Sequence, residues 1–236
     1  MGFFDFIDTI DAYKDHRGPV ARMNHRHAHI VLPFLDDIRG ARVLDLAAHD
    51  GRWSYALAGA GAAHVVGVEA RPELIARFPE FPDPALRARV ELRCNDIYAE
   101  MEADIARGVS YDVVAVYGIL YHVMDHFRLF QLVRRLRPKL VIVDSEFNTR
   151  PNPMIQLIRE RTDNVLNAVP QFDGQEVALK GVPSFLAMEA IAEALLYDIT
   201  WIDWTDLPEG QRGAVGDYFR TTNMRRGTCA LRPVQP

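Results

Sequence analysis

The sequence predicts an α/β protein built on a doubly wound, mostly parallel sheet of seven strands. Short apolar runs alternate along the chain with segments of helical period, which is typical of strand–helix–strand units. Most of these runs are apolar at every position, as in strands that are buried on both faces of a sheet. A turn of small residues around Gly51 separates the first run from a helical segment, and the acid Glu69 ends the next run.

The elements follow one another from residue 42 to residue 231. The predicted strands cover residues 42–46, 64–69, 90–94, 112–117, 140–144, 199–204 and 228–231. The predicted helices fill the gaps between them, at residues 53–60, 72–78, 97–106, 124–136 and 184–196. Ser184 follows Pro183 and comes directly before apolar residues of helical period, so we expect it to cap the last helix.

A single domain is expected over residues 1–236, because a chain of this length with 49% hydrophobic residues supplies one well-packed core. A helical lid is expected at residues 1–40, before the first half of the sheet at 41–144. Residues 145–183 are too long for an ordinary loop and predict a substrate-binding insertion, with a helix at 154–161. The lid and the insertion should lie at the carboxyl ends of the strands, where ligands bind in such sheets. Residues 184–236 complete the sheet.

Composition and charge exclude several classes of partner. The net charge of −5 provides no general attraction to DNA or to an anionic membrane. No apolar run reaches the roughly 18 residues of a membrane-spanning helix, and the first residues lack the basic region of a signal peptide. Cys94 and Cys229 lie in apolar runs without metal-type spacing, so we expect buried thiols in a reducing compartment. These features predict a cytoplasmic protein.

The acids Asp45 and Glu69 indicate the kind of cofactor. A strand, a tight turn, a helix, a second strand and an acid form the pocket for adenosine-containing cofactors in α/β folds. Asp45 stands at the tip of the first strand, where a carboxylate would repel a pyrophosphate and attract a cation. NAD would also require a Gly-x-Gly-x-x-Gly turn, which this segment lacks. The pattern therefore favours S-adenosylmethionine (SAM), which carries a sulfonium and an ammonium.

From about residue 41 to residue 231 the chain resembles the class I SAM-dependent methyltransferases, which share a Rossmann-like fold. The first motif of that family is an acid followed by alternating glycines, and Asp45 and Gly51 match its two ends. Ala47 and His49 stand where glycines are usual. Glycine permits a positive φ, alanine does not favour it, and histidine is among the residues that sometimes adopt it. We therefore expect the shape of this turn to depart from that of the family.

The resemblance implies a role for each matching residue of the first motif. Asp45 would accept a hydrogen bond from the methionine ammonium, directly or through water. Backbone groups of Ala47 and Gly51 would line the cofactor. Glu69 would bind both ribose hydroxyls, since a carboxylate offers two acceptor oxygens to a vicinal diol.

Further positions complete the implied cofactor site. Asp96 would accept from the adenine amino group and Ile97 would cover the adenine ring, although Asp96 is also suited to cap the helix that begins there. Tyr117 ends the fourth strand, close to the sulfonium side. Trp53, in the helix after the first turn, is the remaining expected contact from this half of the chain.

The run Gly118-Ile119-Leu120-Tyr121-His122 is similar to the segment after the fourth strand in many methyltransferases, including transfer-RNA wobble-uridine carboxymethylating enzymes. This similarity places Tyr121 and His122 toward the transferable methyl group. A hydroxyl is a poor nucleophile while it keeps its proton, and histidine is the natural base near neutral pH. His122 is therefore the predicted catalytic base, and the alternative is a histidine that packs against or caps the next helix.

Asp144 and Glu146 lie two residues apart at the end of the fifth strand. Their carboxylates suggest three alternatives: a Mg²⁺ site, a pair that orients two hydroxyls of a sugar together with His122, or the base itself. A fourth alternative is that one carboxylate pairs with Arg150 or with another arginine.

A basic face is expected on the helix of the N-terminal lid. Arg22, His25, Arg26 and His29 recur at the spacing of one helix face. That face could fold over the cofactor, with Arg22 or Arg26 pairing with the methionine carboxylate, or it could contact an anionic acceptor. An exposed polar face is the third alternative.

The leading functional hypothesis is an O-methyltransferase for a small, polar, hydroxylated acceptor, with a saccharide as one candidate. It depends on the polar side chains expected around the pocket. A transfer-RNA-modifying enzyme is the nearest competitor, although the acidic balance argues against it. A non-catalytic SAM-binding partner subunit is the other alternative, because the glycine motif is incomplete. A homodimer formed through the lid helices stays open.

Overall fold

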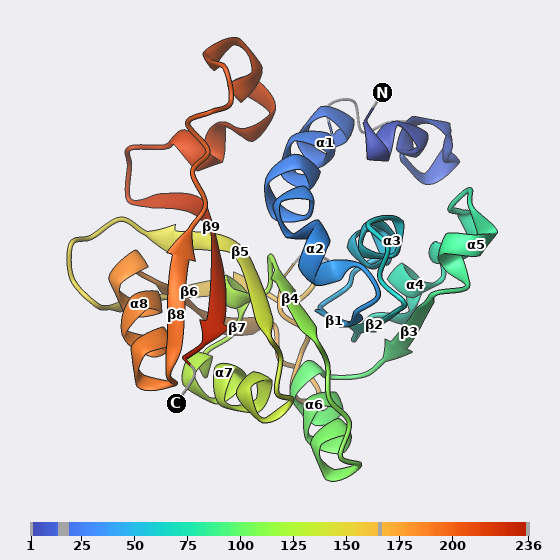
Figure 1. The fold of residues 1–236 in the computed structure, drawn as a ribbon. Coiled ribbons are helices and arrows are strands. Elements are labelled where there is room, and N and C mark those ends of the chain that lie inside the picture. The colour runs from blue at the N-terminus through green and yellow to red at the C-terminus, as the bar shows by residue number, and fades with distance from the viewer. Residues whose placement is uncertain (1, 14–18, 165–166, 235–236) are drawn as a thin grey trace.

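The computed structural model describes residues 2–13, 19–164 and 167–234. A seven-stranded sheet forms its centre, with strand order β3-β2-β1-β4-β5-β9-β8 (Figure 1). The strands are β1 (Arg42–Leu46), β2 (His64–Glu69), β3 (Val90–Cys94), β4 (Val113–Tyr117), β5 (Leu140–Asn148), β8 (Tyr197–Trp201) and β9 (Met224–Pro233). Only β9 in this sheet runs antiparallel to its neighbours, β5 and β8. The predicted doubly wound, mostly parallel sheet is confirmed.

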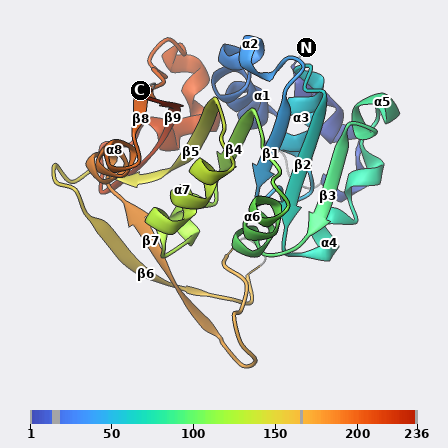
Figure 2. The ribbon, with the colours of Figure 1, turned by 60° about the horizontal axis from the view of Figure 1, so that its bottom comes forward.

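Helices cover both faces of the sheet (Figures 1 and 2). On one face lie α1 (Pro19–Ile30), α2 (Leu35–Ile38) and α3 (Arg52–Gly59), and on the other α6 (Ile97–Ala106), α7 (His126–Arg135) and α8 (Phe185–Ala194). The short elements are α4 (Pro72–Ile75), α5 (Pro84–Arg87), η1 (Phe3–Thr9), η2 (Asp11–Tyr13), η3 (Leu32–Phe34), η4 (Phe78–Glu80), η5 (Leu120–His122) and η6 (Glu209–Phe219). Each face has its own apolar cluster, because successive side chains of a strand point to opposite sides: Val43 joins the α3 side and Leu44 the α6 side.

Most element boundaries agree with the sequence prediction. The strands β1, β2 and β3 and the helix α6 have the predicted bounds. The expected helix at 72–78 is reduced to the single turn α4 and the 3₁₀ turn η4. Ser184 caps α8, since its hydroxyl accepts the backbone N–H of Ala187 at 3.0 Å.

The expected helix at 154–161 is wrong. This segment is the strand β6 (Ile155–Arg161), which pairs antiparallel with β7 (Val177–Pro183) in a hairpin that extends away from the main sheet (Figure 2). Exposure alternates along β6, with Glu160 buried between the exposed Arg159 and Arg161. A strand places alternate residues on opposite faces, so this one acid points inward while its neighbours face solvent.

The turn after β1 adopts the left-handed backbone conformation without its usual glycines. Ala47 has φ 58° and His49 has φ 56°, beside Gly51 at 79°. Ala47 therefore adopts a positive φ that alanine does not favour, and the expected departure of this turn from the shape usual in the family stays a prediction. The conformation costs about 1 kcal/mol for each non-glycine residue. Contacts of the turn offset this cost, since the N–H of Ala48 donates to Val68 O at 2.9 Å and that of His49 to Glu69 at 2.9 Å.

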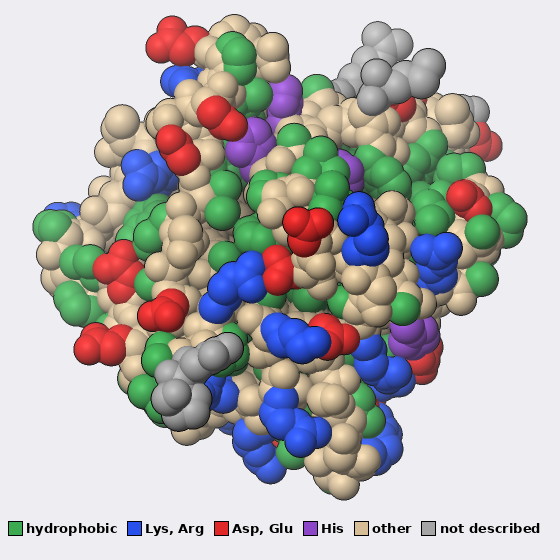
Figure 3. Space-filling view, viewed as in Figure 1, with side chains coloured by type: hydrophobic (Ala, Val, Ile, Leu, Met, Phe, Trp, Pro, Cys, Tyr) green, Lys and Arg blue, Asp and Glu red, His purple; other side chains and the backbone are tan. Residues whose placement is uncertain are grey.

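The two cysteines differ in exposure. Cys229 is fully buried in β9, as expected, but Cys94 is exposed at the end of the edge strand β3, which corrects the prediction of two buried thiols. No helix among the described residues is long and apolar enough to cross a membrane. Basic and acidic side chains are interspersed on the face that Figure 3 shows.

His27 connects α1 to the N-terminal turn η1. Its ring stacks on Phe3 at 5.0 Å and meets the edge of Phe4 at 5.9 Å, and burial lowers its pKa from 6.5 to about 4. The unfolded chain therefore binds a proton that the folded chain rejects between these two pH values. We expect stability to be complete above pH 6.5 and to fall as the pH decreases toward 4.

The variant His27→Phe keeps an aromatic ring at this position and removes the titrating group. We expect it to reduce the loss of stability between pH 6.5 and pH 4 by about 1 kcal/mol, a modest value because the side chain is partly exposed. Urea denaturation at pH 7.5, 6 and 4.5 would measure this. An unchanged pH slope in the variant would contradict the assignment to His27.

Candidate active site

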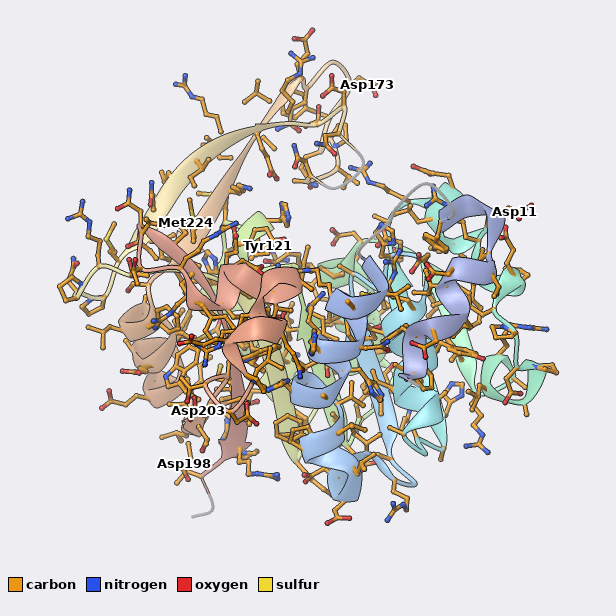
Figure 4. All side chains as sticks on the ribbon, turned by 90° about the horizontal axis from the view of Figure 1, so that it is seen from above. Asp11, Tyr121, Asp173, Asp198, Asp203 and Met224 are labelled. Carbon is orange, nitrogen blue, oxygen red and sulfur yellow. The ribbon has the colours of Figure 1, made fainter. Side chains whose placement is uncertain are left out.

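A cavity of about 1430 Å³ opens at the carboxyl ends of β1, β2 and β4. Pockets for one small molecule are roughly 300–1,000 Å³, so this cavity has room for two ligands side by side. The residues predicted from the sequence that line it are Arg22, Arg26, Ala47, Trp53, Glu69, Asp96, Ile97, Tyr117, Tyr121 and His122. In Figure 4 the hairpin, with Asp173 near its tip, arches above Tyr121 and leans toward the segment that carries Asp11.

Glu69 is a buried carboxylate in the cavity wall. Its Oε2 accepts the backbone N–H of His49 at 2.9 Å and its Oε1 that of Arg71 at 3.0 Å. Each carboxylate oxygen has two lone-pair sites, so one acceptor position on each oxygen remains for a ligand. This geometry suits the two hydroxyls of a ribose, and the two backbone donors fix the orientation of the carboxylate.

Asp96 caps a helix and also lies at the cavity. Its Oδ1 accepts the N–H groups of Tyr98 and Ala99 at 2.9 and 3.0 Å, which caps α6. Asp96 and Ile97 also lie in the cavity wall, so capping uses one oxygen and leaves the side chain at the ligand surface.

Two predicted cofactor residues lie behind the cavity wall instead of in it. Asp45 is 1% exposed, accepts the hydroxyl of Ser54 at 2.7 Å, and has its pKa raised by burial to about 7. Gly51 is buried, and a Cβ there would lie 2.6 Å from the Phe78 ring. The carboxylate of Asp45 thus binds α3 through Ser54 and does not line the cavity, and its hydrogen bond to the methionine ammonium, directly or through water, stays a prediction.

The basic face of α1 packs against the C-terminal segment of the chain. Arg22 binds both oxygens of Asp217 at 2.6 and 2.7 Å, and His29 contacts Asp206 at 2.9 Å. Arg26 donates to Tyr218 at 3.0 Å and lies 4.8 Å from the centre of the Trp53 ring. Arg22 and Arg26 still line the cavity, but both guanidinium groups already have partners within the protein.

Asp144 is the centre of a buried polar cluster. Its Oδ1 accepts from Arg26 and Arg226, both at 2.7 Å, and its Oδ2 accepts from Tyr218 at 2.7 Å and Thr228 at 2.8 Å. Burial alone would raise its pKa, but the two guanidinium groups hold that pKa at about 2. Asp144 is therefore ionised at neutral pH and too weak a base for proton transfer.

The pair Asp144 and Glu146 does not fit the magnesium site that the sequence suggested. Four donors occupy the oxygens of Asp144, and Glu146 pairs with Arg220 at 3.3 Å at the surface. Neither acid lines the cavity, so neither takes the role of base or of sugar ligand. The alternative of arginine pairing is confirmed for Asp144, with Arg26 and Arg226. Among the described residues, no group of three or more His, Cys, Asp or Glu side chains is arranged to hold a metal ion.

His122 lies in the cavity wall with a carboxylate behind it. Its Nδ1 is 3.0 and 3.1 Å from the two oxygens of Glu160, which also contacts Lys180 at 3.0 Å. Burial lowers the pKa of His122 below 6.5, although Glu160 opposes this shift. The ring is therefore neutral at pH 7, with its proton on Nδ1 facing the carboxylate and its Nε2 free to accept one.

Glu160 was not among the residues that the sequence suggested. The segment around it was expected to form a helix. In a helix, an acid between Arg159 and Arg161 does not indicate which of the three side chains is buried. The period-two exposure of a strand would have marked Glu160 as the inward acid.

Tyr121 lies against His122, with their rings 4.2 Å apart, and its hydroxyl is 3.4 Å from an Nη of Arg226. Two backbone carbonyls, Leu120 O and Gly181 O, lie 3.0 Å from Nε2 of His126. These contacts tie η5 to β7 and so fix the segment that carries Tyr121 and His122.

Comparisons with known proteins agree with this arrangement. Residues 43–139 match the family described as a methyltransferase domain. The N-terminal domain of EvdMO1, solved with S-adenosylhomocysteine (SAH) and D-fucose, is 20% identical, with a TM-score of 0.62 over 93% of this chain and 84% of that one. No curated protein matches the sequence significantly.

Two further solved structures share the fold at lower identity. A SAM-dependent methyltransferase from Mesorhizobium loti is 15% identical, with a TM-score of 0.56 over 84% of this chain and 96% of that one. The 1,6-didemethyltoxoflavin-N1-methyltransferase of Burkholderia thailandensis, bound to its substrate and SAH, is 15% identical, with a TM-score of 0.51 over 97% and 83%. Together, the strand order and these solved structures show that the chain has the Rossmann-like methyltransferase fold, and residues 43–139 match the methyltransferase domain family.

Proposed function

We propose that the protein transfers the methyl group of SAM to a hydroxyl of a small, polar metabolite, with His122 as the base. The observation that carries this proposal is His122, which lies in the wall of the same cavity as Glu69 and Asp96 and is paired with Glu160 behind that wall. The likeness to a domain solved with SAH and D-fucose supports a saccharide as the acceptor. The proposal keeps the cytoplasmic location predicted from the sequence.

The residues of the cavity wall fit the cofactor. Glu69 would hold the ribose and Asp96 the adenine amino group, with Ile97 against the ring and Tyr117 and Trp53 near the methionine part. SAM supplies an electrophilic methyl group on its sulfonium. Arg22 is paired with Asp217, and Arg26 with Asp144. The methionine carboxylate would therefore be attracted by these two guanidinium groups without replacing either acid.

The acceptor loses its proton to His122. A hydroxyl within hydrogen-bond reach of Nε2 would give up its proton as the oxygen attacks, and the proton would remain on Nε2. Glu160 stabilises the resulting imidazolium and holds the ring in the tautomer with Nδ1 protonated. The larger part of the rate enhancement would come from holding donor and acceptor in line within one cavity.

The proposal is tested by transfer of labelled methyl from SAM to a panel of saccharides, phenols, amines and bulk transfer RNA, with and without a chelator. We expect methyl ether formation on one class of hydroxylated small molecule, unaffected by the chelator. Labelling of amines alone would favour N-methylation, as in the Burkholderia relative. Labelling of RNA alone, or of nothing despite SAM binding, would contradict the proposal in favour of a transfer-RNA enzyme or a non-catalytic subunit.

Glu69→Ala is expected to weaken SAM binding by about 10- to 100-fold, because two hydrogen bonds from ribose to a buried carboxylate are lost. The matched control is Glu73→Ala, which removes an exposed acid four residues away in α4. Isothermal titration with SAM and with SAH would measure both variants. Equal affinities for the wild type and Glu69→Ala would remove Glu69 from the cofactor site.

Light scattering at several protein concentrations would test the homodimer that the sequence left open. A stable dimer has twice the molar mass of the chain and keeps that mass on dilution, whereas a monomer has the mass of one chain.

A further inference from the structure

A single peptide group, between Asn167 and Ala168, binds to two sides of the cavity. Its carbonyl oxygen, on Asn167, accepts from Nη2 of Arg71 at 2.8 Å. Its N–H, on Ala168, donates to Oε1 of Glu160 at 2.9 Å. Because the peptide bond is planar, this oxygen and this N–H belong to one rigid unit and cannot turn independently. A shift of Arg71 therefore also shifts the donor that holds Glu160.

The outer ends of this connection are the two acids of the proposed reaction. Arg71 lies two residues after Glu69, and its own backbone N–H donates to Oε1 of Glu69 at 3.0 Å. At the other end, Glu160 holds Nδ1 of His122 at 3.0 Å. Hydrogen bonds, joined through the Arg71 side chain and the Asn167–Ala168 peptide group, thus lead from the carboxylate proposed to face the ribose to the ring proposed to face the acceptor.

The charge of Arg71 strengthens this connection. A guanidinium that donates to a carbonyl polarises the peptide group and makes its N–H a stronger donor. Arg71 also donates to the carbonyl of Asn164 at 3.3 Å, so it holds the hairpin loop at two points. Another arginine of the same wall, Arg77, has no hydrogen bond to this loop among the described residues, which makes it a matched control.

We propose that Arg71 is a positioning residue that couples occupancy of the Glu69 site to the orientation of Glu160 and His122. SAM or SAH at Glu69 would restrict the segment 69–71, and Arg71 would pass this restriction to the Asn167–Ala168 peptide group. By thermodynamic reciprocity, a well-placed peptide group would in turn favour the cofactor-bound form. The proposal rests on the proposed function for the contact of Glu69 with the cofactor and for the role of His122 as base.

The first test measures hydrogen exchange at the Ala168 amide by NMR, with and without SAH, and requires no acceptor. In the wild type we expect SAH to slow this exchange. Arg71→Ala should speed exchange about 10- to 100-fold and abolish the effect of SAH, since a charge-assisted hydrogen bond is lost. Arg77→Ala should behave as the wild type. Unchanged exchange in Arg71→Ala, or an undiminished SAH effect there, would overturn the proposal.

The second test separates positioning from simple loss of structure. Arg71→Ala should lower kcat by about tenfold while SAM affinity stays within about threefold, and Arg71→Lys should recover part of kcat. The acid limb of its pH–rate profile should move to lower pH, because a loosened Glu160 supports the His122 imidazolium less. If the acid limb of the pH–rate profile stays in place and SAM affinity falls in proportion to kcat, Arg71 is not a positioning residue. If transfer proves independent of His122, the proposed function fails while the exchange result still decides the coupling.

Discussion

Replacing His122 with asparagine is expected to lower kcat for methyl transfer by about 10²- to 10⁴-fold, the usual contribution of a general base. SAM affinity should stay within about threefold, since the cofactor contacts proposed for Glu69 and Asp96 are separate from the ring. Asparagine keeps a polar group near Glu160 and cannot accept the acceptor's proton near neutral pH. Steady-state rates combined with calorimetric SAM binding would measure both quantities.

His64→Asn is the control for this experiment. His64 begins β2 at the end of the sheet opposite the cavity and pairs with Glu91 at the surface. It should leave kcat unchanged. A fall of less than about fivefold in His122→Asn would show that alignment alone supplies the rate, and the base would then have to be removed from the account.

The second large effect is on folding and concerns Asp144. Asp144→Asn leaves the buried guanidinium group of Arg26 without a negative partner and leaves that of Arg226 with Asp217, at 3.2 Å, in place of two acids. Both arginines are less than 10% exposed. We expect the free energy of unfolding to fall by about 3–5 kcal/mol, the cost of breaking a buried ion pair by removing one member. Urea denaturation at pH 7.5 would measure the change.

Glu146→Gln is the matched control, because Glu146 lies two residues further along β5 and pairs with the exposed Arg220. A pair of this kind contributes at most about 1 kcal/mol. Adding Arg26→Met to Asp144→Asn should restore part of the lost stability, because it removes the buried charge that has lost its acidic partner. A loss below about 1 kcal/mol in Asp144→Asn would show that the cluster tolerates Arg26 without an acidic partner.

The sheet was predictable from the sequence because its signals are local. The apolar runs of β1, β2 and β4 are short and bounded by polar turns, so their positions follow from five or six neighbouring residues. The acid at the end of β2 follows from the same pattern. Glu69 was therefore placed at the cavity from this pattern, and Asp96 from the resemblance to methyltransferases, before any contact was known.

The partners of the charged residues were not predictable in this way. Arg26 and Asp144 are 118 positions apart, and Arg22 and Asp217 are 195 apart. The sequence indicated that the basic residues of α1 share a face, but only the packing of η6 against α1 shows what that face meets. Asp144 was considered for a metal or a base, and two distant arginines account for it instead.

The proposed catalytic pair, His122 and Glu160, was half predictable. His122 follows β4 in a segment whose similarity to other methyltransferases could be recognised, whereas Glu160 depends on the hairpin register that sets it opposite Ala178. The charged and apolar residues of β6 fit a helix as well as a strand, and only its pairing with β7 selects the strand. The backbone conformation at Ala47 and His49 was not predictable from residue type either, since both adopt the positive φ for which glycine is usual.

The account depends most on His122 as a neutral base oriented by Glu160, and the pH dependence of methyl transfer tests this directly. With saturating SAM, the wild type should lose activity at low pH with an apparent pKa below 6.5, because burial disfavours the protonated ring. Glu160→Gln should move this limb to still lower pH, since Glu160 raises the pKa of His122, and His122→Asn should abolish it. A wild-type limb that persists unchanged in both variants would contradict the account.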